Sequence, residues 1–309
     1  MDLHDYFEKF CTAKLAERRS PKTIKIYRDH VGRFMTWCAS EGISGVDLVG
    51  QTGAEVIEEF LLSLDGEGLA PASIGIAYRC LRAVYRWSYD RFEDELRAEG
   101  KIPFKWLKQP TVPELLPKNI SLNEVLILLH SIKGPARKGD PIWVPHRDRL
   151  IIKTLFYTGM RAGELLSLSV NDVDLERRLL RVMRWKVHKQ EFVPIAKSLV
   201  SEYKAWIEVQ RPQVDGSGLW PTFQTGSNQG TFLNADGLKE MLRRRCTNAG
   251  LPQYRAHAFR HGCAINIIKR GGDISLVQRI LGHRDISTSQ IYLRYDMDTI
   301  TGLYDKVFD

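Results

Sequence analysis

Apolar residues recur at helical spacing through the first hundred residues of the chain. Between Ser20 and Gly42 the pattern predicts a helix, with Ser20 as its cap, Pro21 in its first position and Gly42 at its end. The positions that follow the helical period there are Ile24, Tyr27, Val31, Phe34 and Met35. Residues 70–92 predict a second long helix, and residues 53–64 a shorter one.

Prolines separate this region from the rest of the chain. They lie at Pro103, Pro110, Pro113 and Pro117. Because proline blocks helix and restricts the residue before it, residues 101–119 are expected to form an extended linker. A new helix is predicted from Ser121, where "SLNE" is a capping box before the apolar run "VLILL". We therefore expect two domains, residues 1–110 and 111–309.

The second region is predicted to be mainly helical with one small β-hairpin. The stretch "RLLRVMRWKVHKQEFVPI" (178–195) alternates and is rich in Val, Leu and Phe, which indicates two strands with a turn near 186–189. Two short helices, at about 288–295 and 298–308, are expected to close the chain. The predicted fold is thus mainly α.

Composition narrows the class of protein. The 309 residues are 43% hydrophobic and 27% charged, typical of a globular protein, and no apolar run is long enough to span a bilayer. The acidic, amphipathic N-terminus does not resemble a signal peptide. The five cysteines, which include no CxxC pair, indicate neither a disulfide framework nor a zinc site, and a reducing cytoplasm is expected. These cysteines are Cys11, Cys38, Cys80, Cys246 and Cys263.

Positive charge is concentrated in the second region. Residues 1–110 hold 16 Lys and Arg against 17 Asp and Glu, whereas the remaining chain holds 29 against 20. A basic domain of this kind suits a polyanion such as nucleic acid. The alternative is a basic surface without a partner.

Two motifs place arginines where they could bind an anion. In "TGMRAGELLSL" (158–168), Arg161 is expected in the first turn of an amphipathic helix, where helix N–H groups also favour an anion. The alternative is a surface ion pair with Glu164. In "HAFRHGCAINII" (257–268), His257 and Arg260 share a helix face, and an arginine fork can bind two phosphate oxygens. The alternative is a capping histidine beside a solvated arginine.

A third motif, "LGHRDISTSQIYLRY" (281–295), contains one histidine and two tyrosines. Gly282 is expected to end a helix and release His283 into a loop, and Tyr292 and Tyr295 lie three residues apart on the next helix. A tyrosine on an apolar face is usually part of the core. The complete set of two arginines, two histidines, a hairpin lysine and a late tyrosine is suited to phosphodiester chemistry without metal. The sequence offers no carboxylate cluster typical of a metal nuclease.

These three motifs, in this order and spacing, resemble the tyrosine recombinase (phage integrase) family, and in size the chain is similar to the two-domain Xer-type recombinases. The resemblance implies that Arg161, His257, Arg260 and His283 are catalytic, that Tyr292 is the nucleophile and that Tyr295 packs. Counting back from "VP" at 193–194, it implies that Lys186 is the general acid. The hairpin lacks the glycines that often flank this lysine, and the distance along the chain from Arg161 is one residue longer than is usual in Xer proteins. Lys189 therefore remains the alternative.

The resemblance also gives the first region a role. It implies an N-terminal four-helix SAM-like core-binding domain that clamps the duplex, opposite a mostly helical catalytic domain with a small β-hairpin or sheet. Basic residues at helical spacing are then candidates for DNA contact. They are Lys22, Lys25, Arg33, Arg79, Arg82 and Arg86, together with Lys189 if Lys186 is the acid.

The function implied is site-specific DNA recombination through a 3′-phosphotyrosine and a Holliday junction. The expected partners are double-stranded DNA carrying specific recombination sites and three further copies of the chain. The tail, residues 298–309, is expected to dock into a neighbouring protomer; folding back on its own domain is the alternative. No metal, cofactor or membrane is expected to be involved. The rival functions are DNA relaxation of the type IB topoisomerase kind and a catalytically silent DNA-binding regulator.

Overall fold

The computed structural model of the protein describes residues 3–43, 48, 50–92, 103–105, 107–113, 118–134, 138–184, 189–222, 232–282 and 292. The chain separates into two compact units, residues 1–115 and 116–309. The structure thus divides the chain five residues beyond the position taken from the proline pattern.

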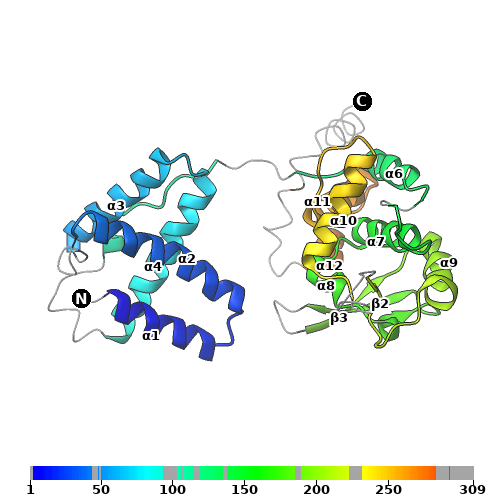
Figure 1. Cartoon of the computed structure of the whole chain (residues 1–309), viewed down its shortest axis with the longest axis horizontal. Helices are drawn as coiled ribbons and strands as arrows, with labels where there is room; N and C mark the ends of the chain where they lie inside the picture. The colour runs from blue at the N-terminus through cyan, green and yellow to red at the C-terminus, as the bar shows by residue number, and fades with distance from the viewer. Residues whose placement is uncertain are drawn as a thin grey trace. The chain divides into compact units, whose positions relative to one another are not determined.

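In the part that the structure describes, the first unit is a bundle of four α-helices (Figure 1). These are α1 (Leu3–Ala16), α2 (Pro21–Ser40), α3 (Gly50–Gly66) and α4 (Pro71–Arg91), followed by the short 3₁₀ helix η2 (Pro103–Lys105). Aromatic side chains fill the core: the rings of Phe34 and Phe60 meet edge to face at 5.0 Å, and Tyr85 is fully buried. The bundle presents its charged side chains outward, as the amphipathic pattern requires.

Local chemistry sets the helix ends as the sequence predicts. The hydroxyl of Ser20 accepts a hydrogen bond from the N–H of Thr23 at 3.2 Å, and Pro21 occupies the first position of α2. In the second unit, Ser121 and Glu124 form the predicted capping box of α6 (Leu122–Ser131). These caps satisfy N–H groups that a helix cannot satisfy internally.

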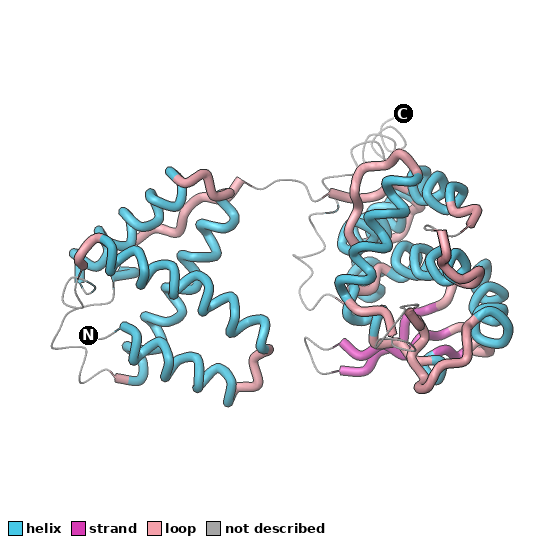
Figure 2. The backbone as a smooth tube through the Cα atoms, viewed as in Figure 1, coloured by secondary structure: helices cyan, strands magenta, loops and turns pink. Residues whose placement is uncertain are grey.

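The second unit is mainly helical, with the strands gathered at one end (Figure 2). After α6 come α7 (Val144–Thr158), α8 (Ala162–Leu166) and the 3₁₀ helix η3 (Val170–Asp172). The strands β1 (Val173–Asp174), β2 (Leu179–Arg184) and β3 (Lys189–Pro194) follow. The chain continues through α9 (Lys197–Ala205), the π-helical turn η5 (Trp206–Gln210), α10 (Ala235–Asn248), α11 (Ala256–Lys269) and α12 (Ile274–Leu281).

The three strands form an antiparallel sheet in the order β1-β2-β3. Leu180 lies opposite Val193, and Arg184 opposite Lys189, so the predicted hairpin is present. On β2 the side chains of Leu180, Val182 and Arg184 are buried, because alternate residues of a strand point to the same face. An arginine therefore occupies the last inward position of this strand.

Helix α7 lies within the core and positions the candidate site at its end. Leu150, Ile151, Ile152, Leu155 and Phe156 are all buried, and α11 packs against this helix. Gly159 ends α7 in the left-handed conformation, with φ of 59°. A Cβ at this position would lie 2.3 Å from a methyl carbon of Leu281, so only glycine fits between α7 and α12.

Several expectations fall outside the described residues. They are the hairpin turn with Lys186, the loop with His283, and the two closing helices, which include Tyr295. Of the closing helices, the structure describes Tyr292 alone. Of the loop motif, the structure describes its beginning: Gly282 caps α12 in the left-handed conformation, with φ of 65°, as predicted. Among the described residues, no helix has the length and apolar character needed to cross a membrane.

Candidate active site

Arg161 is the N-cap of α8 and not, as expected, in the first turn of a longer amphipathic helix. Helix α8 has only five residues, because the chain after it pairs with a distant segment. The carbonyl of Leu165 accepts a hydrogen bond from the Trp220 indole at 2.9 Å, and that of Leu168 accepts one from the Leu219 N–H at 2.8 Å. The Arg161 side chain lies at the N-terminus of α8 and is about one-third exposed.

Glu164 fixes Arg161 from within the same helix. One carboxylate oxygen accepts the Arg161 backbone N–H at 2.8 Å, and the other accepts the Arg161 guanidinium at 2.8 Å. Burial would raise the pKa of Glu164, but these hydrogen bonds and the charges of Arg184 and Arg161 outweigh it, so the pKa is lowered. The ion pair considered as an alternative to a catalytic role is therefore present, and it orients Arg161.

Arg184 connects three segments of the unit. It is 2% exposed and donates to Glu164 at 2.7 Å and to the carbonyl of Ile280 at 3.0 Å, while its Nε lies 3.1 Å from Glu191. Its guanidinium also lies against Gly282, where an added Cβ would approach Nε to 2.9 Å. One side chain thus joins the hairpin, the helix of Arg161 and the end of α12.

Arg260 is buried between the ends of two helices. Its side chain, only 1% exposed, donates to the carbonyl of Gly159 at 2.7 Å and to that of Leu281 at 2.8 Å. Burial, and then the charge of Arg161, lower the pKa of Arg260 to about 10, so it remains protonated at neutral pH. This placement excludes the alternative of a solvated arginine.

His257 and Tyr292 belong to the same cluster. The pKa of His257 is lowered by partial desolvation and then by the charges of Arg260 and Arg161. The ring of His257 meets that of His261 edge to face at 4.4 Å. Tyr292 lies within electrostatic range of Arg260, and its hydroxyl is hydrogen-bonded to Nδ1 of His261 at 3.0 Å. The structure therefore brings together Arg161, His257, Arg260 and Tyr292.

Tyr292 is also part of an apolar cluster. Its side chain is 2% exposed and packs with residues of α11 and α12: Ala264, Ile265, Ile268, Val277 and Leu281. The ring of Tyr292 is thus part of the core, while its hydroxyl reaches His261.

The other candidates from the sequence lie apart from this cluster or outside the described residues. Lys186 and His283 are outside them, and Lys189 is exposed at the start of β3. In the first unit Lys22, Lys25, Arg33, Arg79, Arg82 and Arg86 are all exposed. Arg33 is paired with Glu67, and Arg86 lies 3.9 Å from Asp90.

Sequence reasoning did not select Arg184 or His261, and it considered Glu164 only as a surface partner. Two patterns were available to find them. Arg184 occupies an inward position of an alternating strand, and His261 directly follows Arg260 in the motif "HAFRH".

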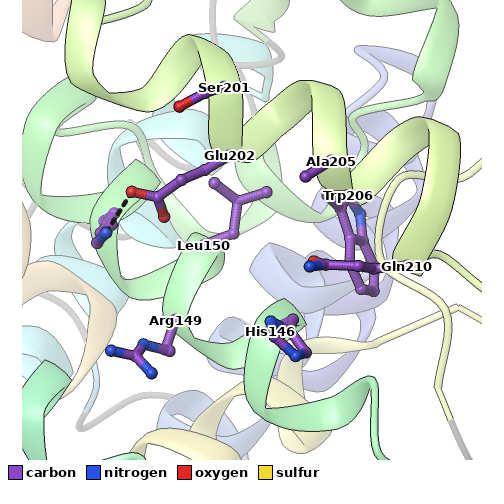
Figure 3. Close-up of a pocket in the computed structure, with 9 residues that line it drawn as sticks. His146, Arg149, Leu150, Ser201, Glu202, Ala205, Trp206 and Gln210 are labelled. Carbon is purple, nitrogen blue, oxygen red and sulfur yellow. Dashed lines mark hydrogen bonds and ion pairs between the residues drawn. The ribbon is translucent and has the colours of Figure 1, made fainter.

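A separate pocket is lined by residues 146–153 of α7 together with residues of α9 and η5 (Figure 3). It has a volume of about 350 Å³ and includes His146, Arg149 and Gln210, with an ion pair between Lys153 and Glu202 at its edge. None of the candidate catalytic residues lines it. Within the described residues, no group of three or more His, Cys, Asp or Glu side chains could hold a metal ion.

Comparison with known proteins identifies the class that this fold and cluster define. Residues 120–298 match the phage integrase family. The chain is 31% identical to the tyrosine recombinase XerA of Thermococcus kodakarensis over 303 residues, which covers 98% of this chain and 95% of the relative. It is 27% identical to the tyrosine recombinase XerC of Mycobacterium leprae over 93% of each chain. The chain therefore belongs to the phage integrase family of tyrosine recombinases, as the motifs predicted.

Solved structures show the same fold. One is the XerH site-specific recombinase bound to a palindromic difH substrate in a post-cleavage complex, with a TM-score of 0.67 and 23% identity over 98% of this chain and 84% of that chain. Another is the Tn1549 transposon integrase in complex with a circular intermediate DNA, with a TM-score of 0.69 and 19% identity over 97% and 99% of the two chains. The predicted mainly α fold with a small sheet is thus confirmed.

Proposed function

We propose that this protein is a site-specific DNA recombinase that cuts and rejoins strands through a 3′-phosphotyrosine and a Holliday junction. The observation that carries the proposal is the convergence of Arg161, His257, Arg260 and Tyr292. Arg260 binds the carbonyl of Gly159, two residues before Arg161, and His261 contacts both the His257 ring and the Tyr292 hydroxyl. Relatives named as recombinases match nearly the full length of the chain, which supports recombination over the topoisomerase and regulator alternatives.

In the first chemical step, Oη of Tyr292 attacks the scissile phosphorus. The Oη–P bond forms as the bond between phosphorus and the 5′ oxygen breaks, and the phenolic proton passes from Oη to solvent water. Arg161 and Arg260 stabilise the charge that builds on the non-bridging oxygens, with His257 beside them. Arg260 uses two of its five N–H donors on Gly159 and Leu281, so others remain for a phosphate.

The departing 5′ oxygen gains a proton from a lysine of the hairpin, which we assign to Lys186 with Lys189 as the alternative. Lys189 contacts the DNA backbone if Lys186 is the acid. His283 completes the phosphate site from the loop after Gly282. The second step reverses the first with a 5′ hydroxyl from the partner duplex, so the ester keeps the bond energy and neither ATP nor another cofactor is required.

Double-stranded DNA is the proposed substrate, held by both units. Arg79, Arg82 and Arg86 lie at i, i+3 and i+7 on α4, and all three are exposed, as a surface that binds phosphates requires. Lys22, Lys25 and Arg33 on α2 form a second candidate group. The net charge of +8 favours association with a polyanion.

Recombination joins two sites, and we propose that four protomers assemble on them. In this arrangement the tail, residues 298–309, docks into a neighbouring protomer. A short helix with an apolar stripe needs a surface to bury it, and a head-to-tail contact repeated around a ring closes a tetramer.

The proposal is tested by finding the DNA to which the protein becomes covalently attached. Adducts are recovered from cells under denaturing conditions, the attached DNA is sequenced, and two copies of the enriched site are placed on a plasmid with purified protein and EDTA. Excision between the two copies is expected. Relaxation of supercoiled plasmid without site preference, or no adduct at all, would reject recombination.

A further inference from the structure

His261 is the residue of the "HAFRH" motif to which the proposed chemistry gives no role. It follows Arg260 on α11, is 8% exposed, and its Nδ1 lies 3.0 Å from the hydroxyl of Tyr292. The two rings are 5.5 Å apart between centroids. The ring of His257 also meets that of His261 edge to face at 4.4 Å. His261 thus contacts both a candidate catalytic histidine and the proposed nucleophile.

The charge state of His261 decides what it can do for the hydroxyl. Burial, followed by the charges of His257 and Arg260, lowers the pKa of His261 to about 4, so the ring is neutral at physiological pH. With its proton on Nε2, a neutral ring accepts a hydrogen bond at Nδ1. It is too weak a base to take the phenolic proton, so its contribution is to hold the hydroxyl and not to ionise it.

The surroundings of Tyr292 make this contact specific. Its ring is held by the apolar cluster of α11 and α12, including Ile268 and Leu281, and an apolar cluster fixes the position of a ring but not the direction of its O–H bond. The helix end at Leu281 also binds Arg260, which in turn lies within electrostatic range of Tyr292. A polar partner at the hydroxyl therefore sets its orientation beside Arg260.

Resting on the function proposed above, we propose that His261 is a positioning residue that accepts a hydrogen bond from Tyr292 and holds the nucleophile for cleavage. The contact acts before the covalent bond exists. Once the phosphotyrosine has formed, Oη has no proton to donate, and the ester itself holds the oxygen. His261 should therefore assist cleavage and contribute little to rejoining.

The test compares three variants on a nicked suicide substrate carrying the enriched site. His261→Leu removes the acceptor at similar size, and His261→Asn keeps a polar atom close to the place of Nδ1. Ile132→Val removes one methylene group from the other core cluster of this unit, which does not include Tyr292, and serves as the control for lost stability. Single-turnover cleavage, DNA binding, thermal unfolding and rejoining from a preformed adduct are measured for each.

We expect His261→Leu to cleave about ten- to a hundredfold more slowly, in line with the effect of a misplaced reacting group. Its DNA affinity should stay within about twofold, and its rejoining rate within about threefold of wild type. His261→Asn should recover most of the cleavage rate. Ile132→Val should lose stability but cleave normally.

Two results would overturn the inference. One is normal cleavage by His261→Leu, and the other is an equal loss of cleavage and rejoining that His261→Asn does not restore, which would indicate a purely structural histidine. If the wild-type protein itself forms no adduct, the proposed function fails instead, so the two failures are distinguishable.

Discussion

The guanidinium of Arg260 is fixed by backbone carbonyls and not by a carboxylate. Gly159 and Leu281, which supply these carbonyls, lie at the ends of α7 and α12, where helix dipoles favour a cation. In the part of the chain that the structure describes, no carboxylate pairs with Arg260. Its positive charge is therefore positioned without being neutralised, which suits a group that must attract a phosphate.

Arg184, in contrast, is paired with the carboxylates of Glu164 and Glu191. Its role is therefore to hold the hairpin, α8 and the end of α12 together. Arg184→Met should lower the free energy of unfolding by about 3 kcal/mol, because it removes the buried one of the two arginines that pair with the carboxylate of Glu164. Chemical denaturation measures this. Arg181→Met on the same strand is the matched control: its exposed pair with Asp172 should contribute only about 0.5 kcal/mol. Equal losses in the two variants would contradict the assignment.

We propose that Lys186 is the general acid that protonates the departing 5′ oxygen. Lys186→Ala should slow cleavage strongly, and a substrate with sulfur at the 5′ bridging position should restore much of the rate, because a thiolate leaves without a proton. Lys189→Ala should cleave the normal substrate at a rate close to wild type. If Lys189→Ala is the variant that sulfur rescues, the assignment must move to Lys189.

At the scale of elements, the sequence predicts helix ends best where neighbouring residues determine them. Ser20 with Pro21, Ser121 with Glu124, and Gly282 all act within one helical turn, and all three ends are where the pattern places them. The shortness of α8 could not be predicted, because it depends on hydrogen bonds to Leu219 and Trp220, more than 50 residues away.

In the site, too, the sequence predicts what neighbouring residues determine and not what depends on distant contacts. The motifs select Arg161, His257, Arg260 and Tyr292 as candidates, and the structure brings these four together. Contacts to Arg184 come from 20 and 96 residues away, so no local pattern reveals what it joins. Alternation along β2 shows only that its side chain points inward.

Helix α4 carries the element-scale prediction for DNA binding. Replacing Arg79 and Arg82 with alanine should weaken DNA binding and reduce the slope of log K against log salt by roughly 1 for each lost phosphate contact. Fluorescence anisotropy over a salt series measures the slope. Arg28→Ala is the control, because both terminal nitrogens of this exposed arginine already bind Glu8. If Arg28→Ala reduces the slope as much as the α4 variants do, the assignment of Arg79 and Arg82 to phosphate contacts is rejected.

At the scale of the whole molecule, assembly is expected to depend on the tail. Deleting residues 299–309 should leave binding to a single half-site intact but weaken synapsis of two sites, since the apolar stripe Ile300, Leu303, Tyr304 and Val307 would be lost. Native gels and two-site recombination assays separate these steps. A truncated protein that forms normal tetramers and recombines at the normal rate would contradict docking into a neighbour.

The central claim is that Tyr292 forms the covalent bond to DNA. The most direct measurement is mass spectrometry of the peptide that carries a nucleotide after wild-type protein reacts with a nicked suicide substrate. The account predicts the added mass on Tyr292, no adduct from Tyr292→Phe, and a normal adduct from Tyr295→Phe. A nucleotide on any other residue, or an adduct that survives in Tyr292→Phe, would contradict it.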